Sequence, residues 1–253
     1  MVNAVVLGGG GEDVRLAGFY EGPSKGLIEL AGRPCLQHVL TALRDTPGVA
    51  RIALTGPPAV FDHAAAGMVD VRLSGDLSIV EKLTAAATAF DDGRKLLMVT
   101  CDIPLATSMT YDDIIGRCPS QAAFFHPLVT KAAALHDFPR HKWVFLKLRE
   151  GQVVTTNVLM IDAGVLLHRT DLATMLEDLR RHPVRLALQF GLGFLLKFKL
   201  GLLGLGECER FFSDLLGAPV CGAITDHTSL AMDLDRPEDV PMLAQALAAR
   251  EGR

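Results

Sequence analysis

Short apolar runs alternate with amphipathic stretches through the first hundred residues of the chain. The runs are bounded by glycine, proline or aspartate and have the length of buried strands, at residues 4–7, 51–55, 69–73 and 96–100. Between them, residues 35–43 and 79–90 carry apolar positions at helical spacing. Strands that alternate with helices in this way predict a parallel sheet covered by helices on both faces.

The pattern changes near residue 122, where strand-like runs follow one another without long helical stretches between them. These runs cover residues 122–125, 143–148 and 153–161, and a charged loop and a Glu150-Gly151 turn connect them. We expect antiparallel strands to join the sheet here. The prediction is therefore an α/β, three-layer Rossmann-like fold with a mixed, mostly parallel sheet.

The most apolar window of the chain runs from Leu186 to Gly206 and reads LALQFGLGFLLKFKLGLLGLG. Lys197, Lys199 and several glycines interrupt it, whereas a membrane-spanning helix needs about 20 apolar residues with few charges. We predict a helical hairpin, inserted near residues 175–218, that is buried or faces a partner. An apolar lid over a lipid-like or alcohol-bearing substrate, or a contact with a membrane surface, are the alternatives.

The last part of the chain returns to the α/β pattern. It offers a helical ECERFFSDLLG, a strand-like run at residues 219–224, and a final helix entered through Arg236-Pro237-Glu238-Asp239. No repeat or low-complexity linker divides the chain. We therefore predict a single domain over residues 1–253.

Composition narrows the function classes. The 253 residues carry a formal net charge of −4, which gives no general attraction to nucleic acid. The five cysteines at positions 35, 101, 118, 208 and 221 show no zinc spacing, and we expect all of them to be free thiols in the core. No basic and apolar leader opens the chain, so we predict a cytoplasmic protein.

Four consecutive glycines, Gly8 to Gly11, follow the first predicted strand. Glycines there let main-chain N–H groups approach a ligand and hold phosphate oxygens. The spacing fits neither a Walker A loop, because Gly26 and Leu27 follow Lys25, nor a dinucleotide fingerprint, because Asp13 stands at the third glycine position. A long loop with Arg15 in its middle and Lys25 at its end remains, which would suit a triphosphate; a turn with solvated charges is the alternative.

Three aspartates are candidates for a metal site. Asp102 follows the apolar run LLMVT, and the carboxyl end of a central parallel strand faces the ligand crevice. Asp233 and Asp235 lie two apart on an extended run and so share one face. Helix capping by Asp102, and turn formation by Asp233 and Asp235, are the structural alternatives.

These motifs together resemble the MobA-like NTP transferase group, nucleotidyltransferases of the GT-A-like fold. The matching segments are LGGGGEDVRLAG, PSKGLIELAGRPCLQHVL, VTCDIPL and MDLDRPEDV, and their order agrees along essentially the whole chain. The resemblance implies that Leu7 and the glycine loop bind the nucleotide and that Arg15 and Lys25 hold its phosphates. It also implies a catalytic Mg²⁺ on Asp102, completed by Asp233 or Asp235.

Further positions follow from the same resemblance. Ser78 and Lys82 correspond to residues beside the base and ribose, although an ordinary helix N-cap followed by a solvated lysine would look the same. Asn157 falls where the family places a residue facing the acceptor. His126 and Lys131, with the basic residues 140–142, flank the proposed site as a docking surface for the acceptor phosphate or, alternatively, as solvated loop charges.

The resemblance predicts Mg²⁺-dependent transfer of a nucleoside monophosphate from a nucleoside triphosphate to a small phosphorylated acceptor, with release of pyrophosphate. A sugar phosphate, an alcohol phosphate and a cofactor phosphate are all open as acceptors, as are a homodimer and an apolar or membrane-surface contact through residues 186–206. One alternative is a non-catalytic nucleotide-binding regulatory protein. The other is a GT-A glycosyltransferase, which commonly carries D-x-D where this chain has Thr100-Cys101-Asp102.

Overall fold

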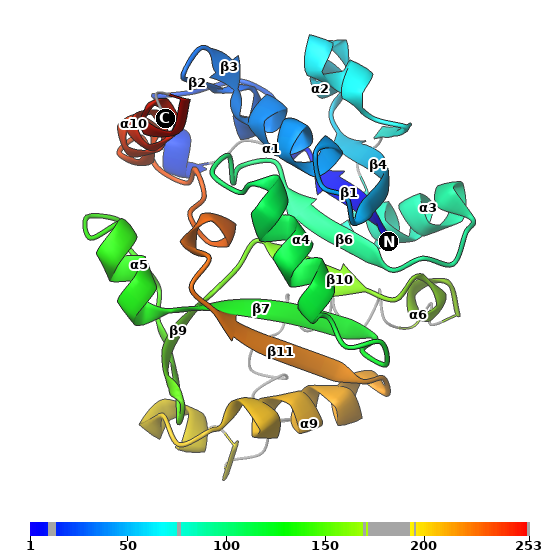
Figure 1. The fold of residues 1–253 in the computed structure, drawn as a ribbon, viewed down its shortest axis with the longest axis vertical. Helices are drawn as coiled ribbons and strands as arrows, with labels where there is room; N and C mark the ends of the chain where they lie inside the picture. The colour runs from blue at the N-terminus through cyan, green and yellow to red at the C-terminus, as the bar shows by residue number, and fades with distance from the viewer. Residues whose placement is uncertain (10–13, 75–76, 169–170, 172–192, 195, 252–253) are drawn as a thin grey trace.

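The computed structural model describes residues 1–9, 14–74, 77–168, 171, 193–194 and 196–251 (Figure 1). A nine-stranded sheet runs through the described chain in the order β5-β4-β1-β6-β10-β7-β9-β8, and β11 pairs with β7. The strands are β1 (Val2–Leu7), β4 (Val49–Gly56), β5 (Val71–Ser74), β6 (Leu96–Thr100), β7 (Phe124–Thr130), β8 (Leu146–Leu148), β9 (Gly151–Thr155), β10 (Val158–Ile161) and β11 (Val220–Thr225). A small hairpin, β2 (Glu29–Leu30) and β3 (Arg33–Pro34), lies outside this sheet.

The first half of the sheet is parallel, as the sequence predicted. β1 pairs in parallel with β4 and β6, and β4 pairs in parallel with β5. Both faces of these strands are covered, which explains why the residues of β1 from Ala4 to Leu7 form a continuous apolar run rather than an alternating one. The carboxyl ends of β1 and β6 therefore lie side by side.

The second half of the sheet is mixed. β10 is antiparallel to both β6 and β7, β9 is antiparallel to β7 and β8, and β11 is parallel to β7. The single strand predicted over residues 153–161 is wrong, because Thr156 and Asn157 separate β9 from β10. The Thr156 hydroxyl donates to the Pro127 carbonyl at 2.9 Å, and the Asn157 N–H donates to the Leu230 carbonyl at 2.9 Å. These bonds fix a corner that leaves Asn157 at the end of β10 nearest to Thr100.

Helices cover both faces, so the predicted three-layer α/β fold is confirmed. The helices are α1 (Cys35–Arg44), α2 (Pro58–Asp62), α3 (Ile79–Phe90), α4 (Ser108–Arg117), α5 (Lys131–Asp137), α6 (Ala163–His168), α9 (Leu205–Leu216) and α10 (Asp239–Glu251). α1 and α4 pack into the core on one face, and α3, α6 and the end of α9 pack on the other. α10 and α5 lie along one edge of the molecule (Figure 1).

Several expectations need correction or lie outside the described residues. The helix α4 was not predicted, because its polar residues obscure the three buried positions Thr110, Tyr111 and Ile114. All five cysteines are free; Cys35 and Cys101 are buried, whereas Cys118, Cys208 and Cys221 are half-buried and pack against the core clusters. Of the predicted hairpin over residues 175–218, α9 and a helical stretch at residues 196–200 are described, while 175–192 fall outside the described ranges.

The apolar window raised the question of a membrane span. Within the described residues, no helix is both long enough and apolar enough to cross a bilayer.

Candidate functional site

Asp102 lies just beyond the end of β6, at the edge where the parallel strands finish. Its side chain is only 5% exposed, and the Thr100 hydroxyl donates to its Oδ1. The neighbouring strand ends are joined around it, because the Cys101 N–H donates to the Leu7 carbonyl at 3.1 Å. The turn after the central strand thus holds one carboxylate at the edge of the sheet, as the sequence predicted.

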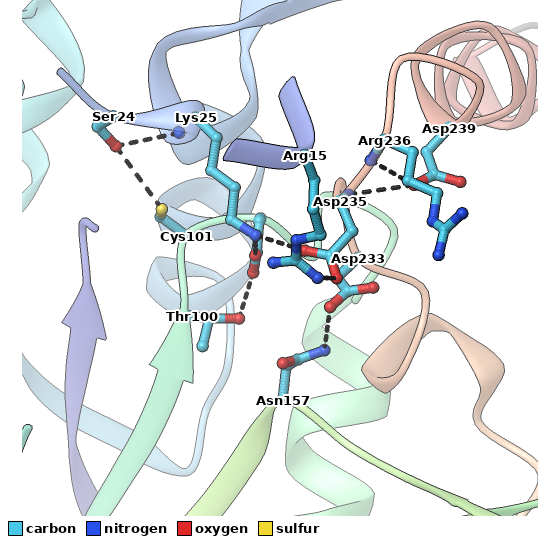
Figure 2. A network of polar contacts seen from close by, with 12 residues as sticks. Arg15, Ser24, Lys25, Thr100, Cys101, Asn157, Asp233, Asp235, Arg236 and Asp239 are labelled. Carbon is cyan, nitrogen blue, oxygen red and sulfur yellow. Dashed lines mark hydrogen bonds and ion pairs between the residues drawn. The ribbon is translucent and has the colours of Figure 1, made fainter. Parts of the chain in front are cut away.

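Asp233 and Asp235 reach the same place from the loop before α10. Oxygen atoms of Asp102, Asp233 and Asp235 all lie within 4.8 Å of one another. The Asn157 amide donates to Asp233 Oδ2 at 3.2 Å, approaching it from the side opposite to Lys25 and Arg15 (Figure 2). The structure therefore brings together three carboxylates and the amide that the sequence had suggested separately.

A buried hydrogen bond between His141 and Asp239 positions the loop that carries these two aspartates. The Asp239 carboxylate accepts the N–H groups of Asp235 at 3.1 Å and of Arg236 at 2.8 Å. The His141 Nδ1 atom also donates to this carboxylate at 2.9 Å, and both side chains are almost fully buried. The sequence indicated only that Asp239 favours the start of α10 and that His141 belongs to a basic loop. It did not predict the contact between them.

Two cations face the carboxylates. Lys25 Nζ lies 2.5 Å from Asp102 Oδ2 and 2.7 Å from Asp235 Oδ1, and the Arg15 guanidinium also pairs with Asp235 (Figure 2). Lys25 is mostly buried, with 19% of its side chain exposed, whereas the Arg15 side chain is 53% exposed. The two phosphate ligands predicted from the sequence are therefore held beside the predicted metal ligands.

Among the described residues, three carboxylates face two cations at this site, so their charges do not balance. Burial, followed by the charges of Asp102 and Asp235, raises the pKa of Asp233 to about 7. Burial alone would lower the pKa of Lys25, but the adjacent Asp102 and Asp235 outweigh it and raise that pKa. The site therefore has an unmet demand for positive charge, which a divalent cation could supply.

This electrostatic imbalance predicts a pH dependence of stability. A carboxyl whose pKa is higher in the folded protein binds more protons when folded, so the free energy of unfolding falls as pH rises. For Asp233 this fall occurs between the ordinary value of 3.8 and about 7. We expect the melting temperature without divalent cations to drop across this window more steeply for the wild type than for Asp233→Asn. Equal slopes in thermal melts would contradict the assignment.

The described part of the glycine loop packs tightly on the ends of β1 and β4. A Cβ atom at Gly8 would lie 2.4 Å from the Thr55 carbonyl oxygen, and Gly9 has φ +80°. The Ser24 hydroxyl donates to the Gly8 carbonyl and accepts the Gly26 N–H at 3.1 Å. Ser24 thereby fixes the turn that presents Lys25, while Gly10 and Gly11 lie outside the described residues.

Gly26 provides a test of this packing. A Cβ atom there would lie 2.9 Å from Cys101 Sγ. We expect Gly26→Ala to destabilise the fold by about 1–3 kcal/mol, as overpacking does in a tight core. Adding Cys101→Ala should recover part of the loss in denaturant titrations, whereas Cys118→Ala, which lies beside Lys95 instead, should recover none.

Other predicted positions lie apart from the carboxylates. Ser78 caps α3, accepting the Glu81 N–H at 3.3 Å, and Lys82 follows in the first turn. His126 donates to the Val158 carbonyl at 3.1 Å, and Lys131 Nζ donates to Gln152 at 3.0 Å. None of these four is in contact with the three aspartates among the interactions of the described chain, so their assignment to nucleotide or acceptor stays a prediction.

Comparison with known proteins gives this arrangement a context. The family model described as the MobA-like NTP transferase domain matches residues 4–139, and no curated protein matches the chain. Among solved structures, a hypothetical transferase from Thermus thermophilus has 28% identity and a TM-score of 0.83, over 95% of this chain and 100% of its own.

Two further structures share the fold at lower identity. A CMP:2-keto-3-deoxy-manno-octonic acid synthetase, complexed with CTP, has 14% identity and a TM-score of 0.63 over 99% of this chain and 98% of its own. A 2-C-methyl-D-erythritol 4-phosphate cytidylyltransferase, also from Thermus thermophilus, has 15% identity and a TM-score of 0.53, over 98% of this chain and 100% of its own. Lys25 and Asp102 lie within the family match, whereas Asp233 and Asp235 lie beyond it.

Proposed function

The chain belongs to the family of MobA-like NTP transferase domains, since the family model covers residues 4–139 of its 253 residues, and from this we propose a specific activity. The protein transfers a nucleoside monophosphate from a nucleoside triphosphate to a small phosphorylated acceptor and releases pyrophosphate. We propose that residues 1–253 form a single nucleotidyltransferase domain. Its location in the cytoplasm also stays a prediction.

The observation that carries this proposal is the grouping of Lys25 with Asp102, Asp233 and Asp235 beside the glycine loop. Main-chain N–H groups and cations suit a triphosphate, and clustered carboxylates suit a hard divalent cation. Three clustered carboxylates would repel an anion that bound alone. The two cations, Lys25 and Arg15, would repel a metal ion that bound alone.

The carboxylates fit Mg²⁺ by the chemistry of their donor atoms, because Mg²⁺ binds through oxygen ligands and often uses one or two carboxylates together with substrate phosphates. Asp102 and one or both of Asp233 and Asp235 would hold it. When bound, Mg²⁺ would neutralise charge on the phosphate oxygens. The Asn157 amide would keep Asp233 oriented toward the same position.

The reaction needs little acid–base catalysis. An oxygen of the acceptor phosphate, already an anion, attacks the α-phosphorus while the bond from that phosphorus to the oxygen of pyrophosphate breaks. Lys25, Arg15 and the N–H groups of the glycine loop stabilise the negative charge that moves onto pyrophosphate. Lys25 therefore exchanges its contacts with Asp102 and Asp235 for phosphate oxygens when substrate enters.

The test is pyrophosphate release with each of ATP, GTP, CTP and UTP in the presence of Mg²⁺. Sugar phosphates, alcohol phosphates and a pterin phosphate serve as acceptors, and the CTP bound to one structural neighbour makes CTP the first nucleotide to try. Release that requires one nucleotide and one class of acceptor supports the proposal. If a nucleotide raises the melting temperature but no acceptor gives release, the regulatory alternative replaces it.

A further inference from the structure

A large apolar cavity lies in the second half of the sheet, away from the carboxylates. It has a volume of about 460 Å³ and lies between the strands β7, β8, β9 and β11 and the helix α9. That volume is within the range of about 300–1,000 Å³ found for small-molecule sites. The walls come mainly from leucine, phenylalanine and cysteine side chains, including Leu128, Leu148, Phe194, Phe198, Cys208 and Phe212.

Two polar side chains on the described cavity wall, Glu209 and His126, have partners within the protein. Glu209 Oε1 accepts the Gly222 N–H at 2.7 Å, and the His126 Nδ1 atom donates to the Val158 carbonyl at 3.1 Å. Burial lowers the pKa of His126, so its ring is neutral near pH 7. The wall therefore offers little to an ionic ligand and a large area to an apolar one.

Neighbouring residues of one short segment of chain line the cavity and contact the candidate active site. Thr155 lines the cavity at the end of β9, and Asn157, two residues further on, contacts Asp233. His126, which also lines the cavity, bonds to Val158, the residue that follows Asn157.

The outer surface beside the cavity is also apolar. Leu196, Leu200 and Leu202 are 59%, 60% and 55% exposed, next to Phe198, which lines the cavity. Lys197 in the same stretch is held by Glu207 at 2.9 Å. Adjacent exposed apolar side chains of this kind mark contact with an apolar partner or ligand, and here they border the cavity wall.

We propose that this cavity binds the apolar chain of an amphiphilic acceptor, an alkyl or isoprenoid phosphate whose phosphate group would be held by Lys25, Arg15 and a divalent cation on Asp102, Asp233 and Asp235. The placement of the phosphate rests on the proposed function, while the binding of the chain depends only on the cavity. The acceptor class is thereby narrowed from any phosphorylated small molecule to a phosphorylated lipid-like alcohol.

The experiment measures the binding of ethyl, butyl, octyl and dodecyl phosphate by calorimetry, below their micelle concentrations, with Mg²⁺ and without nucleotide. Affinity should rise about fourfold for each methylene that enters the cavity, which corresponds to about 0.8 kcal/mol, and then level off once the cavity is full. An affinity that does not change with chain length would overturn the proposal.

Two substitutions link the binding to this cavity. Cys208→Phe, which fills the cavity from α9, should reduce the affinity for dodecyl phosphate at least tenfold, and Thr155→Phe should do so from the sheet side. Arg210→Phe adds the same ring to an exposed position of α9 and should leave binding unchanged. If both folded cavity variants bind dodecyl phosphate as tightly as the wild type, the cavity is not the site.

The two proposals fail in different ways. If binding depends on chain length but no nucleotide gives pyrophosphate release, the proposed cavity site is supported and the proposed transferase activity is wrong. Efficient transfer to short polar phosphates, with no gain from a longer chain, would keep the activity and overturn the lipid-like acceptor.

Discussion

Replacing Asp102 by alanine is expected to lower the rate of pyrophosphate release by at least about a thousandfold, because the change removes a metal ligand and charge stabilisation acting on the reacting phosphates. Its effect on stability should be small. Lys25 keeps its contact with Asp235 at 2.7 Å, and of the causes that raise the pKa of Asp233, burial and the charges of Asp102 and Asp235, the charge of Asp102 is removed. We therefore expect Asp102→Ala to lower turnover strongly while the melting temperature changes little.

Steady-state kinetics and thermal melts of the same preparation check this separation. Asp214→Ala, at an exposed position of α9, is the control and should match the wild type in both measurements. Wild-type turnover in Asp102→Ala would remove Asp102 from the catalytic machinery. If Asp102→Ala fails to fold, this carboxylate is needed to hold the strand ends together. Asp102→Asn, which keeps the shape of the side chain, would then separate the effect on turnover from the effect on stability.

Replacing Lys25 by methionine is expected to lower both the free energy of unfolding and the turnover. Without the ammonium group, Asp102, Asp233 and Asp235 face one another, and Arg15 is the one cation beside them in the part of the chain that the structure describes. Removing one partner of a buried ion pair costs about 3 kcal/mol of unfolding free energy. Because Lys25 would also contact the triphosphate, we expect turnover to fall by about a hundredfold or more.

Divalent cations give this variant a distinctive signature. Addition of Mg²⁺ should restore most of the stability that Lys25→Met loses but not its turnover, since the metal can replace the ammonium beside the carboxylates and not at the phosphates. Urea titrations with and without Mg²⁺ measure the recovery. A loss of stability that Mg²⁺ leaves unchanged would show that Lys25 supports the fold through its packing rather than its charge.

The first half of the fold could be predicted from the sequence because its signals are local. The buried strands up to Leu96–Thr100 are short apolar runs, and the helix at Ile79–Phe90 begins at a serine with a glutamate three residues later. The carboxylate after a central strand follows from the geometry of parallel sheets. Asp102 is therefore found in the place where the pattern put it.

The second half depends on contacts that local patterns do not encode. The break at Thr156 and Asn157 arises because the Thr156 hydroxyl satisfies the Pro127 carbonyl and the Asn157 N–H satisfies Leu230, far along the chain. Apolar residues continue on both sides of this corner, so periodicity alone predicts one long strand. The pairing of His141 with Asp239 was likewise hidden, because a loop residue meets the first residue of α10, 98 positions further along the chain.

The site is completed by residues made late in synthesis. Asp102 and Lys25 leave the ribosome long before Asp233 and Asp235, and at about 5–20 residues per second the intervening chain takes on the order of ten seconds to produce. During that interval the nascent protein has the lysine and one acid of its ion-pair cluster and lacks the other two acids. A polypeptide that ends before Asp233 would still match the family over residues 4–139 and yet lack the complete carboxylate cluster. Binding of a divalent cation would therefore report that translation had passed Asp235.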